Sequence, residues 1–171
     1  MSIEVGTEWV SKAIKDGLLV AVTNGSYIRQ LYPDLRLAAF VLECAKGRGR
    51  IIGSFSESMP AANMYRGEIL GLMAIHLLLV SVNRVHATLA GSVEVVLDCL
   101  GALKCIVHLL PYRIPSRCKH LDILKNILVN CRNLTFTLHY LHVKAHQDEN
   151  VAFDKLSRKL QLNCICNHLA K

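Results

Sequence analysis

The sequence predicts a mixed α/β fold in which one five-stranded sheet carries helices on its faces. Three β-rich runs follow one another between residues 18 and 56 with short connections, a pattern that indicates an antiparallel meander. Farther along the chain, two more β-rich runs alternate with helical segments, and such alternation favours parallel pairing. The two patterns together predict a single sheet that contains both antiparallel and parallel pairs.

The first half of the chain supplies the meander and the longest helix. Apolar side chains at helical spacing predict a helix over 7–16, which Gly17 ends, so we expect residues 1–17 to form a helical extension of a domain over 18–171. The expected strands cover 18–27, 35–45 and 50–56, with a hairpin turn at 46–49. A 3.6-residue apolar period predicts a helix over 63–82. Its expected inner face comprises Tyr65, Ile69, Leu72, Ile75, His76 and Leu79.

The second half alternates strands with helices. The expected elements are a strand over 92–98, a helix over 99–110, a helix over 116–130, a strand over 133–143 and a last helix over 160–171. Pro111 ends the first of these helices because proline cannot continue a helix. A polar loop that begins at Lys144 precedes the last helix.

Composition limits the class of protein. The 171 residues are 52% hydrophobic and only 19% charged, which suits one packed domain and excludes disorder. The amino terminus has no basic segment followed by an apolar one, and the longest apolar run, over 69–80, is too short to span a bilayer. We therefore expect an intracellular protein, nuclear or cytoplasmic, with no membrane partner and with reduced cysteines. The net charge of +7 suits a polyanionic partner.

Polar side chains lie at three places that the expected topology can bring together. Asn24 and Ser26 stand near the end of the first strand, Glu68 stands in the first turns of the long helix, and Asp98 ends the fourth strand. Hard divalent cations such as Mg²⁺ prefer such oxygen ligands. Two such ions about 3.5–4 Å apart activate a water and stabilise the leaving oxygen of a phosphodiester.

Each of these residues also has an ordinary structural interpretation. Asn24 precedes a glycine, and this pair is common in turns. Glu68 suits the positive end of its helix, and Asp98 suits the N-cap of the next one. The functional interpretation therefore depends on their joint order along the chain.

Four motifs in this order resemble those of type 1 ribonucleases H: "NGSY" from Asn24, "YRGEILGL" from Tyr65, "VVLD" up to Asp98 and "HVKAHQDEN" from His142. The chain is most similar to the domains that follow reverse transcriptases in retroelements, and the resemblance extends from Leu18 onward. It implies a ribonuclease H-like fold and cleavage of the RNA strand of RNA/DNA hybrids with Mg²⁺ or Mn²⁺. It also implies an upstream reverse transcriptase domain as a partner.

The resemblance assigns site residues by position. The family's first aspartate falls on Asn24, its glutamate on Glu68, its second aspartate on Asp98 and its mobile-loop histidine on His146. The last carboxylate falls on Asn167 by the pattern of the last helix, in which Asn163 is the upstream asparagine. Direct counting from the histidine places it on Asp154 instead. We prefer Asn167, which implies an enlarged loop before the helix.

Two of the four carboxylate positions are then amides, Asn24 and Asn167. An amide oxygen can ligate a metal but adds no negative charge, so we expect weak metal binding and little or no cleavage. The alternative function is a non-catalytic nucleic-acid-binding or connector domain of a retroelement polymerase. In either case Ser26, Tyr27 and Asn63 are the expected polar contacts to nucleic acid.

Two other metal arrangements are open on the sequence alone. Asp148, Glu149 or Asp154 could supply a substitute ligand from the enlarged loop. His142 and His146 precede Cys164 and Cys166, and these residue types bind Zn²⁺. The Cys-x-Cys spacing is tighter than the usual one, and helical geometry would point the two thiols to different sides, so the sequence disfavours zinc.

Overall fold

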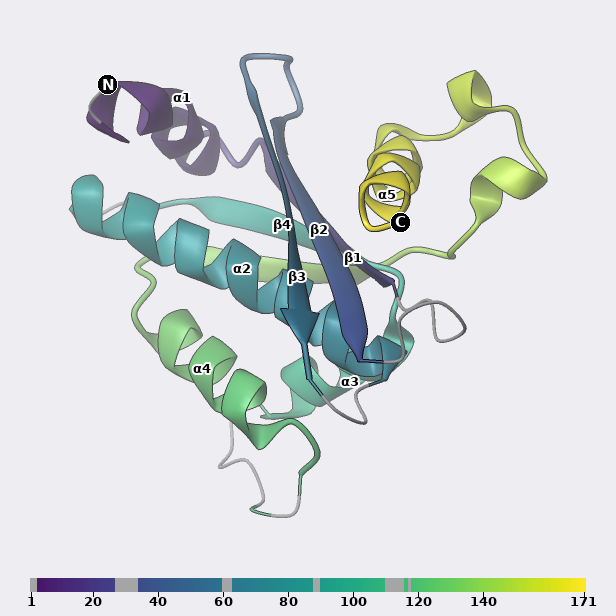
Figure 1. Cartoon of the computed structure of the whole chain (residues 1–171). Helices are drawn as coiled ribbons and strands as arrows, with labels where there is room; N and C mark the ends of the chain where they lie inside the picture. Colours follow the sequence, from purple (N-terminus) through teal and green to yellow (C-terminus); the bar gives the residue numbers. More distant parts are fainter. Residues whose placement is uncertain (1–2, 27–33, 60–62, 88–89, 110–115, 117) are drawn as a thin grey trace.

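A computed structural model describes residues 3–26, 34–59, 63–87, 90–109, 116 and 118–171 of the chain (Figure 1). Its strands are β1 (Leu19–Ser26), β2 (Leu35–Cys44), β3 (Arg50–Ser58), β4 (Ser92–Leu97) and β5 (Thr137–His142). Its α-helices are α1 (Ile3–Lys15), α2 (Met64–Val85), α3 (Leu100–Leu109), α4 (Leu121–Arg132) and α5 (Arg158–Leu169). Two short 3₁₀ segments, η1 (Gln147–Glu149) and η2 (Phe153–Lys155), lie in the loop before α5.

The sheet has the mixed pairing that the sequence predicts. Its strand order is β3-β2-β1-β4-β5. β2 pairs antiparallel with both β1 and β3, whereas β4 pairs parallel with both β1 and β5. The predicted fold class is therefore confirmed.

Helices cover both faces of this sheet. Helices α1 to α4 share one large hydrophobic core with one face, and α5 packs against β1 and β2 on the other (Figure 1). The extension helix α1 contributes Val10, Ala13 and Ile14 to the large core. The hydrophobic effect favours this arrangement, since each helix buries its apolar stripe on the sheet.

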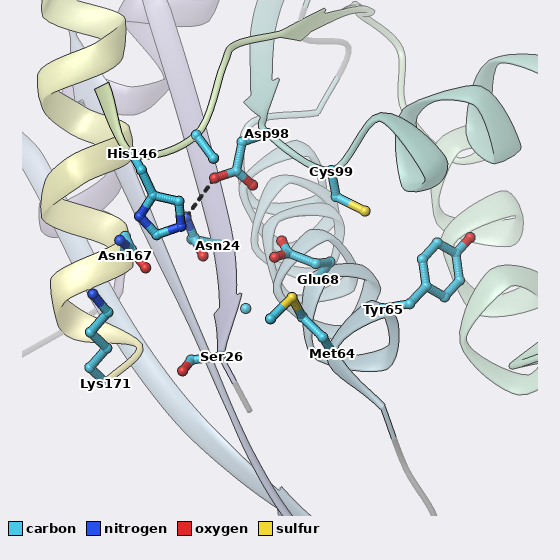
Figure 2. Close-up of a pocket in the computed structure, with 12 residues that line it drawn as sticks. Asn24, Ser26, Met64, Tyr65, Glu68, Asp98, Cys99, His146, Asn167 and Lys171 are labelled. Atoms are coloured by element: carbon cyan, nitrogen blue, oxygen red, sulfur yellow. Dashed lines mark hydrogen bonds between the residues drawn. The ribbon is translucent and has the colours of Figure 1, made fainter. Parts of the chain in front are cut away.

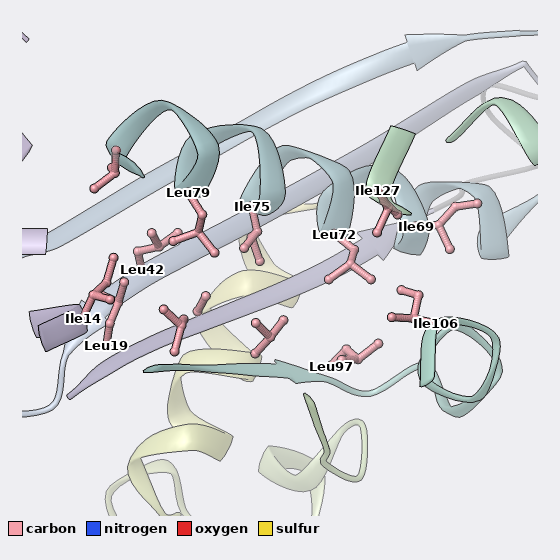
Figure 3. Close-up of a cluster of buried hydrophobic side chains, with 14 of the residues drawn as sticks. Ile14, Leu19, Leu42, Ile69, Leu72, Ile75, Leu79, Leu97, Ile106 and Ile127 are labelled. Carbon is pink, nitrogen blue, oxygen red and sulfur yellow. The ribbon is translucent and has the colours of Figure 1, made fainter. Parts of the chain in front are cut away.

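Helix α2 is the centre of the large core. It is long and apolar enough to cross a bilayer by composition, yet 61% of its most apolar window is buried within the protein. Ile69, Leu72, Ile75 and Leu79 point from it toward the sheet (Figure 3). The expected inner face is thus buried, with Tyr65 only partly so. Core packing accounts for the hydrophobicity of this helix.

Some expected boundaries are wrong by several residues. Helix α4 begins at Leu121 instead of residue 116, and it continues through Arg132. Asn133, which we expected to begin a strand, instead caps α4 and donates its backbone N–H to Asn130. Strand β5 consequently begins only at Thr137.

Candidate active site

The parallel pairing of β1 with β4 brings the first two candidate residues together. Thr23 is the register partner of Leu97, so the next residues, Asn24 and Asp98, follow side by side at the same edge of the sheet. The Asn24 side chain donates from Nδ2 to Oδ2 of Asp98 at 3.0 Å (Figure 2). Asn24 is 4% exposed and therefore fixed within the strand.

The start of α2 places Glu68 beside this pair. Asn63 is the N-cap of α2, and its side-chain oxygen accepts the backbone N–H of Arg66 at 3.0 Å. The buried guanidinium of Arg66 binds Glu57 of β3 and Asp122 of α4, with N–O distances of 2.7 and 2.9 Å. These bonds fix the first turn of α2 between β3 and α4.

Helix α2 and strand β1 approach closely at Gly25. A Cβ atom at this position would lie 2.5 Å from the backbone nitrogen of Glu68. Only glycine fits between the two elements here. The close approach brings the Glu68 side chain next to the end of β1.

A second amide holds Asp98 from the opposite face of the sheet. Asn163 of α5 is 2% exposed and donates from Nδ2 to the same Oδ2 of Asp98 at 3.1 Å. The sequence drew attention to Asn163 only as part of the last-helix pattern. Its contact with Asp98 depends on how α5 lies over β1, which no local pattern reveals.

A cavity of about 400 Å³ opens at this point, and all five of the main candidate residues line it (Figure 2). They are Asn24, Glu68, Asp98, His146 and Asn167. Ser26 also lines the cavity, as do Met64, Tyr65, Cys99 and Lys171, none of which was an expected site residue. Lys171 ends the last-helix pattern that assigns Asn167, but that pattern did not indicate that Lys171 lines the cavity.

The remaining candidates lie elsewhere. Asn63 serves as the cap of α2 and does not line the cavity. Tyr27 lies outside the described residues. Asp154 is exposed in η2 and does not line the cavity, whereas Asn167 does.

Burial controls the charge of Glu68. The side chain is 7% exposed, and desolvation, followed by repulsion from Asp98, raises its pKa to about 8. The backbone N–H of Gly25 opposes this shift only in part. Among the described residues, Oε2 of Glu68 has no hydrogen-bond partner. Burial therefore favours the protonated form of this carboxyl group.

His146 enters the cavity from the loop between β5 and η1. Its backbone is left-handed, with φ of 52°, which is uncommon for a residue other than glycine. Its Nδ1 lies 3.4 Å from Oε1 of Glu149, and its side chain is 54% exposed. The ring is therefore accessible to solvent and to a ligand in the cavity.

These residues do not fit two divalent cations. Among the described residues, Glu68 and Asp98 are the only carboxylic side chains that line the cavity, and Oδ2 of Asp98 already accepts two amide N–H groups. Within the described part of the chain, no three His, Cys, Asp or Glu side chains form a group that could hold a metal ion. The loop carboxylates considered above, Asp148 and Glu149, do not line the cavity either.

The structure also shows the contacts of Cys166 and His142, two of the residues considered above as zinc ligands. Cys166 is fully buried and donates its thiol to the backbone oxygen of Ala39 at 3.0 Å. His142 lies on the exposed side of β5, with Nε2 3.0 Å from the backbone oxygen of Asp98. In the described residues these side chains serve separate structural contacts.

No protein-family model matches the sequence, and no curated protein sequence matches it. Several solved structures, however, are similar to this chain. The native protease–reverse transcriptase of prototype foamy virus aligns with 90% of this chain at 19% identity and a TM-score of 0.65. The ribonuclease H domain of the same virus aligns with 90% at 17% identity and a TM-score of 0.62. A foamy viral protease–reverse transcriptase in complex with double-stranded DNA aligns with 92% at 15% identity and a TM-score of 0.57.

The aligned part spans 20%, 92% and 96% of those three chains, respectively. These likenesses show the fold. The chain has the ribonuclease H fold and resembles the retroviral versions of it.

Proposed function

We propose that this chain is a ribonuclease H-type domain that binds RNA/DNA hybrids and has lost most or all of its metal-dependent hydrolysis. The fold supports the first part of this proposal. Ribonuclease H-type recognition of a hybrid uses its minor groove, through 2′-hydroxyls, phosphates and shape. The net charge of +7 suits such a partner.

The observation that carries the second part is the pair of amide hydrogen bonds to Asp98. Asn24 and Asn163 both donate to Oδ2 of Asp98, so this oxygen already has two amide N–H partners. Metal-dependent phosphodiester hydrolysis needs a cluster of anionic oxygens. With Asn24 and Asn167 in this cavity, two of the four expected negative charges are missing.

A connector role within a larger polymerase is the second candidate. It draws support from the foamy virus protease–reverse transcriptase, in which 90% of this chain aligns with 20% of a much longer chain. An upstream reverse transcriptase domain would be the partner in that case. Nucleic-acid binding and this connector role are compatible.

Cleavage of an end-labelled RNA/DNA hybrid in Mg²⁺ or Mn²⁺ tests the proposal. We expect the freshly purified parent to cleave at least about 100-fold more slowly than Asn24→Asp/Asn167→Asp, because the double variant restores both missing charges. A matched control, Asn126→Asp/Asn133→Asp, adds the same charge at two exposed positions, one within α4 and one at its C-cap, and we expect it to be as inactive as the parent.

The possible results separate the alternatives. Parent activity that equals that of the double variant would contradict the proposed loss of hydrolysis. Binding of the hybrid without cleavage by any of the proteins would contradict the residue assignment and favour a non-catalytic nucleic-acid-binding domain. Intact-mass measurement of the parent excludes deamidation of Asn24, which precedes a glycine, as the source of any activity.

A further inference from the structure

Asp98 accepts hydrogen bonds from two amide groups of the chain itself. Asn24 Nδ2 lies 3.0 Å from Asp98 Oδ2, and Asn163 Nδ2 lies 3.1 Å from the same oxygen. Charged carboxylates accept such bonds strongly because the bonds are charge-assisted. Oδ2 of Asp98 therefore has two hydrogen-bond partners within the protein.

The opposite wall of the cavity carries hydrogen-bond donors and a positive charge. Asn167 and Lys171 lie on this wall, at the end of α5, and His146 lies above them on the preceding loop (Figure 2). Ser26 adds a hydroxyl group at the end of β1. Amide, ammonium, imidazole and hydroxyl groups can all donate hydrogen bonds to an anionic oxygen.

The floor of the cavity contains a polar atom that lacks a partner. Glu68 is more than nine-tenths buried, it lines the cavity, and its Oε2 has no hydrogen-bond partner among the described residues. Buried polar atoms without a partner are uncommon because their desolvation is costly. Oε2 of Glu68 is thus a buried polar atom without a partner at the boundary of the cavity.

The charges of the lining side chains determine which ligands can bind in the cavity. A site with four carboxylates repels a phosphodiester unless cations neutralise it, because like charges a few ångströms apart repel strongly in a partly buried site. This cavity has two carboxylic side chains, of which Asp98 is already bonded to two amides, and it has one lysine. The electrostatic barrier to an anion is correspondingly small.

We infer that this cavity accepts a phosphodiester group of a nucleic-acid strand directly, without a divalent cation, between Asn24 and Ser26 on one side and His146, Asn167 and Lys171 on the other. The inference rests on the proposed function, since it names the group that the same site would take. The amides at 24 and 167 then convert a site for cations into a site for the anion itself. At about 400 Å³ the cavity has room for a phosphodiester and the adjoining sugar.

Fluorescence anisotropy with a labelled RNA/DNA hybrid tests the inference, in EDTA and in Mg²⁺ at equal ionic strength. We expect the parent Kd to agree within about twofold between the two buffers, because no metal takes part in its binding. Asn24→Asp/Asn167→Asp should bind at least about tenfold more weakly in EDTA and should recover in Mg²⁺. The matched control Asn126→Asp/Asn133→Asp should bind like the parent in both buffers.

Asn167→Asp alone provides the same test with less risk to folding. Asn167 is half-buried near the end of α5, and it does not take part in the hydrogen bonds to Asp98. We expect this single variant to weaken binding in EDTA by about threefold or more. Circular dichroism confirms that each variant is folded before binding is measured.

Three results would overturn the inference. A parent that loses binding tenfold in EDTA would show that a metal mediates the contact. Variants that bind in EDTA as tightly as the parent would place the nucleic acid elsewhere on the surface, while the proposed function would survive. A parent that binds the hybrid in neither buffer would refute the proposed binding function, and the inference with it.

Discussion

Glu68 is the residue on which the charge of the cavity depends most strongly. Burial and the neighbouring Asp98 raise its pKa to about 8 from an ordinary value of 4.5. Between these two pH values, the folded protein holds a proton on Glu68 that the unfolded chain has released. Stability must therefore fall as pH rises from 4.5 to 8, and the loss is complete above the higher value.

The substitution Glu68→Gln tests this residue directly. Glutamine has nearly the same shape and cannot ionise, so the variant should gain stability over the parent as pH rises from 5 to 8, by roughly 2–4 kcal/mol. Urea denaturation at a series of pH values measures this difference. A constant difference in the free energy of unfolding across this range would show that Glu68 titrates normally.

His76 does not disturb this comparison. It is buried in the large core, and burial lowers its pKa to about 4, so its contribution to stability is lost as pH falls through the range between 6.5 and 4. Both proteins contain His76, and its effect cancels in the difference between them. The two buried groups act in opposite directions along the pH scale.

The sequence predicted which residues form most of the candidate site, but it could not predict the hydrogen bonds between them. Motif positions pointed to Asn24, Glu68, Asp98, His146 and Asn167, and all five line one cavity. The sequence could not reveal that Asn163 donates to Asp98, because this bond joins residues 65 positions apart. Nor could it reveal the raised pKa of Glu68, since that shift follows from burial by packing.

At the scale of elements, the contact between α2 and β1 sets the geometry of the site. Gly71 of α2 faces Thr23 of β1, and a Cβ atom at position 71 would collide with the Thr23 hydroxyl oxygen. That hydroxyl donates to the backbone oxygen of Ala39 at 3.2 Å, so it is not free to move. The small residue allows the helix to lie close to the strand.

The substitution Gly71→Ala should therefore destabilise the protein by about 1–3 kcal/mol, although alanine is the better helix former. In a Thr23→Ala background, the space is open, and the same substitution should cost less than about 0.5 kcal/mol. Thermal or urea denaturation of the four proteins measures this double-mutant cycle. If Gly71→Ala lowered the free energy of unfolding equally in the parent and in Thr23→Ala, the proposed collision would be refuted.

Element types were easier to predict than element ends. Every expected strand and helix occurs, because apolar periodicity reports which face of an element is buried. The end of α4 was misjudged because Asn133 caps the helix through its backbone, and local composition does not distinguish such a cap from the first residue of a strand. Three of the site residues, Asn24, Glu68 and Asp98, are less affected by this uncertainty because they lie near the ends of β1, α2 and β4.

At the scale of the whole molecule, the candidate site draws on nearly the full chain. Its lining runs from Asn24 in β1 to Lys171 after α5, and it includes residues from helices on both faces of the sheet. Residues that are distant in the sequence are harder to assign to such a site, as the choice between Asn167 and Asp154 for the fourth carboxylate position shows. That choice depends on the length of the loop before α5, which sequence spacing alone left open.

The net charge of +7 gives a prediction for the whole molecule. If the domain binds nucleic acid through phosphates, raising the salt concentration from about 50 to 200 mM should weaken binding to the hybrid at least about tenfold, because counterion release drives such association. Anisotropy titrations over this range measure the slope of log Kd against log salt concentration. A slope near zero would contradict a phosphate-dominated interface.

The most direct test of the central claim is a titration of Mn²⁺ followed by electron paramagnetic resonance, in which only the free ion gives the sharp signal. The claim is that the amides at 24 and 167 have removed the divalent metal site. We expect the parent to leave the Mn²⁺ signal almost unchanged under conditions in which Asn24→Asp/Asn167→Asp binds the ion and reduces the signal. Equal loss of signal with both proteins would contradict the claim.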